Sequence, residues 1–75
     1  MIKVKFFTDS IDSEDIVSPA TTIEGYLKTK NANLSRVMVM FNNETMPKSD
    51  YSLTFNDLTD EDECTITLCA KADCA

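Results

Sequence analysis

An apolar run followed by two asparagines constrains the fold more than any other segment. Val37-Met-Val-Met-Phe41 is predicted to be a strand, and Asn42-Asn43 suits a two-residue turn because asparagine tolerates positive φ better than most residues. Glu44 to Met46 is predicted to return as a short strand. The chain must therefore contain a tight hairpin, and any fold proposed for it must include a sheet.

The first residues predict a second hairpin. Ile2 to Thr8 alternates apolar and polar residues, which places Ile2, Val4 and Phe6 on one face of a half-buried strand. The acidic, serine-containing stretch from 9 to 15 is expected to be a turn. A short strand from 15 to 18 is expected to follow and to end at Pro19.

A helix is predicted after this hairpin. Thr21-Thr-Ile-Glu24 fits a capping box, in which a threonine oxygen accepts from a backbone N–H three residues on and the glutamate accepts from the threonine N–H. Ile23, Tyr26 and Leu27 share one face, and Asn31 suits a left-handed stop after about ten helical residues.

The second half of the chain supplies the last strand and further core residues. Residues 47–58 are expected to form a coil or short helical turn that carries Tyr51, Leu53, Phe55 and Leu58 toward the core. The strand from 64 to 70 should direct Ile66 and Leu68 inward and Thr65, Thr67 and Cys69 outward.

The order of these elements predicts an α+β fold of the β-grasp type. If the first and last strands pair in parallel, one helix covers one face of a mixed four- to five-stranded sheet. At 75 residues the chain is expected to be a single domain, 1–75, which buries only about 60% of its unfolded surface.

Charge and residue types exclude several functional classes. Thirteen acidic and seven basic residues give a net charge of −6, which disfavours nucleic acid and anionic membranes as partners. The acids gather at 9–15 and 57–63, where they are expected to be solvated turns, with an acidic docking edge for a basic partner as the alternative. Without histidine no Ser-His or Cys-His nucleophile pair can form, and one glycine cannot make a phosphate cradle, so we expect no enzyme activity and no cofactor.

The cysteines and the apolar runs predict a cytoplasmic protein. No run reaches the roughly 20 apolar residues that span a bilayer, and an alternating strand is expected where a signal peptide would carry its apolar core. Three cysteines do not make a disulfide framework and are expected to be reduced thiols. A zinc site is not expected, because Cys64 and Cys69 should point to opposite faces of their strand.

The sequence also resembles known families. Residues 21–70 are similar to ubiquitin and to the sulfur carriers of thiamine and molybdopterin synthesis, through the helix, Val39-Met-Phe-Asn-Asn-Glu44, Tyr51 and Thr65-Ile-Thr-Leu-Cys69. The whole chain resembles short ubiquitin-like proteins of bacterial mobile elements, including protein C of the PRTRC system, in Ile2-Lys-Val-Lys-Phe-Phe-Thr8, Asn33-Leu-Ser-Arg36 and Lys71-Ala-Asp73. This resemblance implies a β-grasp fold and an activating-enzyme-like or isopeptidase-like protein as partner.

The last residues bear on whether the chain is a modifier or sulfur carrier. Such proteins act through a terminal Gly-Gly, whereas this sequence ends Lys71-Ala-Asp-Cys-Ala75 and has Gly25 as its single glycine. A thiol at Cys74 is the one alternative for tail chemistry, and Asp73 beside it disfavours the thiolate. The modifier or carrier is therefore the less favoured alternative, and a structural subunit of a larger assembly is a third.

The remaining prediction is a binding surface. Matching Phe41 and Leu68 to core positions of ubiquitin places Met40, Thr67 and Cys69 at the patch that ubiquitin presents to its receptors, with Met38 and Phe7 adjoining. Methionine and aromatic side chains on a sheet are adaptable contact surface. We therefore expect a non-catalytic protein-binding module that uses these five residues. Scattered surface apolar residues, or a self-association contact, are the alternative.

Overall fold

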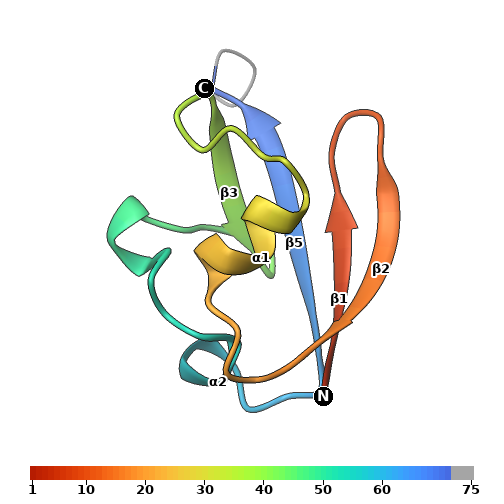
Figure 1. Ribbon diagram of the computed structural model, residues 1–75. Helices are drawn as coiled ribbons and strands as arrows, with labels where there is room; N and C mark the ends of the chain where they lie inside the picture. Colours follow the sequence, from red (N-terminus) through yellow and green to blue (C-terminus); the bar gives the residue numbers. More distant parts are fainter. Residues whose placement is uncertain (72–75) are drawn as a thin grey trace.

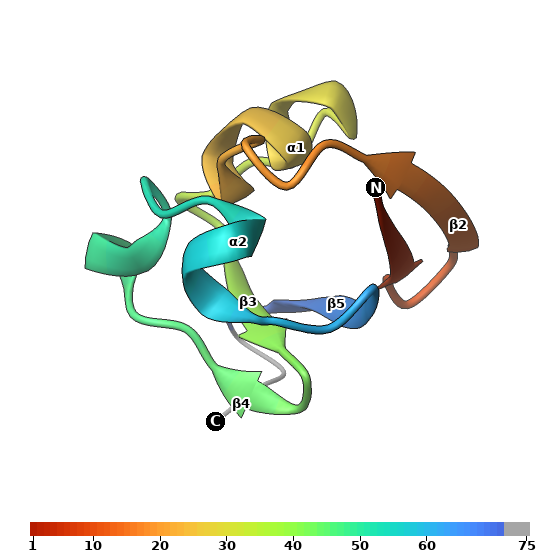
Figure 2. The same cartoon turned by 90° about the horizontal axis from the view of Figure 1, so that it is seen from below.

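The computed structural model describes residues 1–71, which form one mixed sheet with helices on one side (Figures 1 and 2). The strands lie in the order β2-β1-β5-β3-β4. The elements are β1 (Ile2–Phe7), β2 (Asp12–Val17), α1 (Ile23–Thr29), β3 (Val37–Phe41), β4 (Glu44–Thr45), the 3-10 helix η1 (Lys48–Asp50), α2 (Phe55–Leu58) and β5 (Glu63–Ala70).

The centre of the sheet is the parallel pair of β1 and β5. Val4 lies opposite Cys64 and Phe6 opposite Ile66, so the first and last strands run side by side in the same direction. This pairing confirms the topology that the element order predicted. β3 lies antiparallel on the other side of β5, which makes β5 the middle strand of the sheet.

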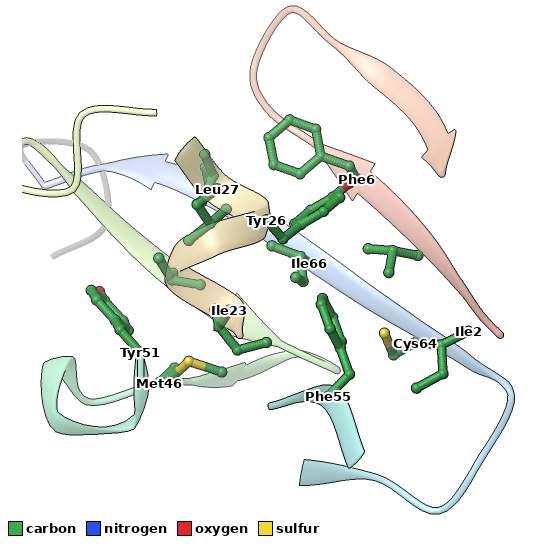
Figure 3. Packing of buried hydrophobic residues seen from close by; sticks show 13 residues of the cluster. Ile2, Phe6, Ile23, Tyr26, Leu27, Met46, Tyr51, Phe55, Cys64 and Ile66 are labelled. Atoms are coloured by element: carbon green, nitrogen blue, oxygen red, sulfur yellow. The ribbon is translucent and has the colours of Figure 1, made fainter. Parts of the chain in front are cut away.

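The core lies between the sheet and α1 (Figure 3). The ring of Tyr26 makes edge-to-face contacts with Phe6 and Phe55, at 5.9 and 5.7 Å between ring centroids. The predicted inward residues of the strands and helix are buried, and Met46, Tyr51 and Phe55 complete the core from the second half of the chain. The buried cluster is Ile2, Val4, Phe6, Ile23, Tyr26, Leu27, Val39, Met46, Tyr51, Phe55, Cys64, Ile66 and Leu68.

The helix begins one residue later than the capping-box pattern predicted. Thr22 is the N-cap, and its side-chain oxygen accepts a hydrogen bond from the Gly25 N–H at 3.0 Å. Gly25 cannot return a side-chain hydrogen bond, so the expected reciprocal box is wrong here. A Cβ on Gly25 would lie 2.9 Å from Thr22 Oγ1, so the glycine gives the capping oxygen room. The reciprocal box occurs instead between Thr54 and Asp57, at the start of α2.

The second strand begins earlier than predicted. β2 covers Asp12–Val17, so Asp12 and Glu14 belong to a strand and not to the acidic turn expected up to 15. The two strands pair without interruption from Phe7 opposite Asp12 to Ile2 opposite Val17. Pairing with β1 therefore outweighs the low strand preference of aspartate.

The asparagine hairpin is confirmed. Asn42 and Asn43 have φ of 50° and 69°, and Asn31 ends the α1 region with φ of 58°. The Asn42 side chain also accepts from the Thr65 N–H at 2.9 Å, which fastens the turn to β5. None of the helices described within residues 1–71 combines the length and apolar character needed to cross a membrane.

Candidate functional site

The five residues predicted to bind a partner share the sheet face that carries no helix in the described chain. In the register of the sheet, Phe7 lies opposite Thr67 and Thr67 lies opposite Met40, while Met38 lies opposite Cys69. Side chains of directly opposed residues lie on the same face of a sheet. Their neighbours Phe6, Val39, Ile66 and Leu68 are all buried against the helix side. We call the surface of Phe7, Met38, Met40, Thr67 and Cys69 the open face.

Phe7, Thr67 and Met40 form a continuous row across three strands. All five residues of the open face are half-buried, so each keeps part of its surface in solvent while its neighbours hold it in place. A hollow of about 570 Å³ lies at this end of the sheet, and residues of both faces line it: Met40, Thr67 and Cys69 from the open face, and Ala32, Val37 and Leu68 from the helix side. A second hollow of about 290 Å³ is lined in part by Met38. The open face therefore combines apolar area with concave surface at its margins.

The same side of the sheet carries a charged pair. Lys5 Nζ lies 2.8 Å from Glu63 Oε1, with both side chains largely in solvent. Their hydrogen bond and mutual attraction raise the pKa of Lys5 and lower the pKa of Glu63. The pair lies closer to the start of β5 than the row of Phe7, Thr67 and Met40, so it bounds the open face with opposite charges.

The cysteines differ from one another. Cys64 is a free thiol in the core, and burial raises its pKa to about 11. Cys69 takes part in a disulfide, so the expectation of reduced thiols is wrong at this residue. Cys64 is buried and Cys69 faces the other side, which confirms that they point to opposite faces. Cys74, Asp73 and the rest of the predicted tail chemistry lie outside the described residues.

A polar cluster that the sequence analysis missed lies between β2 and α1. One oxygen of Asp15 accepts a hydrogen bond from the Tyr26 hydroxyl at 2.7 Å and forms an ion pair with Lys30 at 2.5 Å. Lys30 Nζ also lies 5.4 Å from the centre of the Phe6 ring. The hydrogen bonds from Lys30 and Tyr26 lower the pKa of Asp15. Burial raises the pKa of Tyr26, and the hydrogen bond to Asp15 raises it further. Alternation across β2 places Asp15 on the helix side. The predicted acidic turn ends and the predicted strand begins at this residue, so its side chain was assigned to neither face.

Potential metal ligands do not gather in the described part of the chain. Within residues 1–71, no three histidine, cysteine, aspartate or glutamate side chains come together in a group that could hold a metal ion. The Asp15 cluster joins β2 to α1 through groups that already satisfy one another. The open face is the arrangement that offers apolar surface to another molecule.

The solved structures that share this fold include two ubiquitin-like proteins. The ubiquitin-like domain of an Arabidopsis thaliana protein superposes with a TM-score of 0.71 at 16% identity, over 93% of this chain and 77% of that one. A ubiquitin-like protein from the hyperthermophilic archaeon Caldiarchaeum subterraneum superposes with a TM-score of 0.60 at 14% identity, over 93% of this chain and 96% of that one. The fold is the ubiquitin-like β-grasp. This confirms the predicted α+β class, and at these identities the likeness concerns the fold alone.

Comparison of sequences adds no closer relative to this ubiquitin-like fold. No protein-family model matches the chain. No curated protein matches it either. Any role for the open face therefore has to be argued from its own residues.

Proposed function

We propose that this ubiquitin-like chain is a non-catalytic protein-interaction module, and that a protein partner binds its open face. The observation that carries the proposal is the continuous row of Phe7, Thr67 and Met40 across three neighbouring strands. Flexible methionine and aromatic side chains are enriched at the centres of protein interfaces. Strand pairing fixes the backbone below them, so a partner would bind a preformed surface.

The resemblance of the sequence to mobile-element proteins supports a narrower form of the proposal. It suggests a module of a bacterial mobile element or plasmid system, with an activating-enzyme-like or isopeptidase-like protein as partner. The Lys5–Glu63 pair beside the apolar row would supply polar contacts at the rim, where interfaces are commonly charged.

Replacing Met40 with aspartate tests the proposal. The charge would enter the centre of the interface, where loss of a major contact costs about 2 kcal/mol or more. We expect Met40→Asp to weaken binding of a purified partner by about 30-fold or more. An N-terminally tagged chain would first identify that partner by co-purification from native cytosol, and calorimetric titration would then give the dissociation constants.

A matched control separates this effect from charge alone. Asn56 is exposed on α2, so Asn56→Asp adds the same charge away from the open face and should leave binding unchanged. Partner affinity that survives Met40→Asp in a folded protein would overturn the proposal. Loss of the cooperative unfolding transition in Met40→Asp would instead show that Met40 belongs to the core. Intact mass of the recovered chain tests the other alternative, since a covalent adduct at the C-terminus would favour a modifier or carrier.

A further inference from the structure

β2 forms one edge of the sheet in the described chain (Figure 1). The Thr8 N–H donates to the Ile11 carbonyl at 2.8 Å, and hydrogen-bonded pairs alternate along an antiparallel ladder. Ser13, Asp15 and Val17 therefore bond to β1. The backbone groups of Asp12, Glu14 and Ile16 point the other way, along the open edge.

The backbone of this edge is regular and free to pair with a further strand, and the protecting feature that β2 carries is its acidic side chains, Asp12, Glu14 and Asp15. β2 is six residues long and contains no proline or lysine, and its register with β1 runs without a bulge. Ile16 and Ile11 are the most exposed large apolar residues after Met1, at 60% and 51%. A regular edge with apolar side chains beside it is suited to main-chain hydrogen bonding with another segment.

A groove runs between this edge and α1. It has a volume of about 380 Å³ and is lined by Val17 and Asp15 of β2, by Tyr26 and Thr29 of α1, and by Thr21. A strand added beside β2 would direct alternate side chains to the two faces of the sheet. Those on the helix side would enter the groove, and the others would lie beside Asp12, Glu14 and Ile16.

The charges of the edge select among possible occupants. Asp12 and Glu14 are exposed on the sheet face away from α1, and β2 contains no basic residue. Antiparallel pairing of two copies of β2 would bring these carboxylates toward each other, and like charges on paired strands are destabilising. A strand that places lysine or arginine next to Asp12 and Glu14 would instead be attracted to these carboxylates.

We infer that the β2 edge binds an extended basic peptide segment as an additional strand of the sheet. Its basic side chains lie at alternate positions next to Asp12 and Glu14, and the apolar side chains between them occupy the groove beside α1. Main-chain hydrogen bonds to Asp12, Glu14 and Ile16 hold the segment in register. This surface lies at the opposite end of the strand order from β4, and it adjoins the open face where Asp12 lies opposite Phe7.

The test uses a synthetic peptide of seven residues that alternates valine and arginine, titrated into the full chain and followed by amide NMR shifts. We expect saturable shifts at Asp12, Glu14, Ile16 and Thr29. The matched control peptide has the same composition with its arginines contiguous, and it should bind at least about tenfold more weakly, because it cannot place apolar and basic side chains on opposite faces. Equal binding of both peptides would show that charge alone attracts them, and would overturn the proposal.

Two substitutions at Glu14 separate the main-chain contribution from the charge. Glu14→Pro removes an N–H that points to the open edge, where proline is tolerated, and should weaken binding more than Glu14→Gln does. Glu14→Lys should reverse the preference, so that a peptide alternating valine and glutamate binds better than the arginine peptide. If Glu14→Pro fails to fold, the Glu14→Lys reversal still decides the question.

Further outcomes would each contradict the inference. Shifts confined to the open face, or loss of peptide binding in Met40→Asp, would place the peptide on the other surface. Concentration-dependent broadening of β2 amides without peptide would show that a second copy occupies the edge. If Glu14→Lys leaves the affinity for the arginine peptide unchanged, the acidic side chains of β2 do not contribute to binding.

Discussion

Asp15 joins two elements through a single carboxylate oxygen. That oxygen accepts from the Tyr26 hydroxyl and pairs with Lys30, and the Lys30 ammonium also lies over the Phe6 ring. The carboxylate therefore neutralises a cation that sits against aromatic surface. Without it, Lys30 would lose its partner next to the core, and Tyr26 would lose the acceptor for its hydroxyl.

Replacing Asp15 with asparagine should lower the free energy of unfolding by about 1 kcal/mol at pH 7, because a charge-assisted hydrogen bond is replaced by a weaker one in a site partly open to solvent. The pKa of Asp15 is lowered on folding from the ordinary 3.8, so this stabilisation is fully present above that value. It is lost as the pH falls through the lower pKa of the folded state. The difference between the two proteins should therefore disappear in acid.

Chemical denaturation at pH 7 and at successively lower pH measures this difference. Glu14→Gln is the matched control, because it removes a neighbouring carboxylate that lies on the other face of the same strand. A gap between wild type and Asp15→Asn that persists below the folded pKa would show that packing, and not charge, explains the loss.

α1 depends on its first turn because it is short. Seven residues are too few for an isolated helix, so the cap and the packing of Ile23, Tyr26 and Leu27 must stabilise it. Thr22 supplies that cap, and the Ile23 N–H and Glu24 N–H donate to the carbonyls of Leu53 and Tyr51. The first turn is therefore bonded to the segment before α2 as well as to its own threonine.

Thr22→Ala should lower the free energy of unfolding by about 1 kcal/mol, the usual cost of losing a threonine N-cap. Thr21→Ala is the control, because the sequence pattern assigns the cap to Thr21 and the structure assigns it to Thr22. Urea denaturation of the two variants compares them directly. A larger loss in Thr21→Ala would restore the capping box predicted from the sequence.

The sequence predicts those elements whose causes are local. The Asn42–Asn43 turn follows from the φ preference of asparagine, and the buried residues of β1 follow from alternation along the strand. The start of β2 does not follow in this way, because Asp12 joins the strand through its pairing with Phe7. The Asp15 cluster needs Lys30, which is brought close only when α1 packs on the sheet.

The open face could be predicted in part, whereas the groove beside β2 could not. The resemblance of Phe41 and Leu68 to core positions of ubiquitin predicted that Met40, Thr67 and Cys69 share one face, with Met38 and Phe7 adjoining. The register of the sheet places Phe7 beside them. The groove beside β2 could not be predicted, because it lies between elements whose relative position depends on the whole core. The exposed Ile16 was not a sufficient signal, because single apolar residues are common on protein surfaces.

The folded core shields the Cys64 thiol from solvent and from reagents. Cys64 lies in the middle strand, 2% exposed, and its pKa is raised to about 11 by burial and then by Glu63. At pH 8 the thiol is therefore both inaccessible and protonated. The reactivity of the Cys64 thiol should report opening of the sheet, because β1 pairs with β5 beside Cys64 and the core residues pack over its side chain.

Alkylation with iodoacetamide at pH 8 should modify Cys64 only as the protein unfolds, so its labelling should follow the urea transition seen by circular dichroism. Fragment-ion mass spectrometry assigns the label to Cys64, because no lysine or arginine separates Cys64 from Cys69. Labelling in native buffer at the rate of a short unstructured peptide would show that the core opens locally around β5.

The position of β5 also determines when the fold can form. The middle strand of the sheet is the last to be synthesised, and its partners β1 and β3 have no other strand to join them. A nascent chain that has reached residue 62 therefore holds a hairpin, a short helix and a second hairpin without a common sheet. We infer that the complete sheet cannot form until β5 is outside the ribosome and free to pair with β1 and β3. Until then the apolar faces of both hairpins stay open to chaperones.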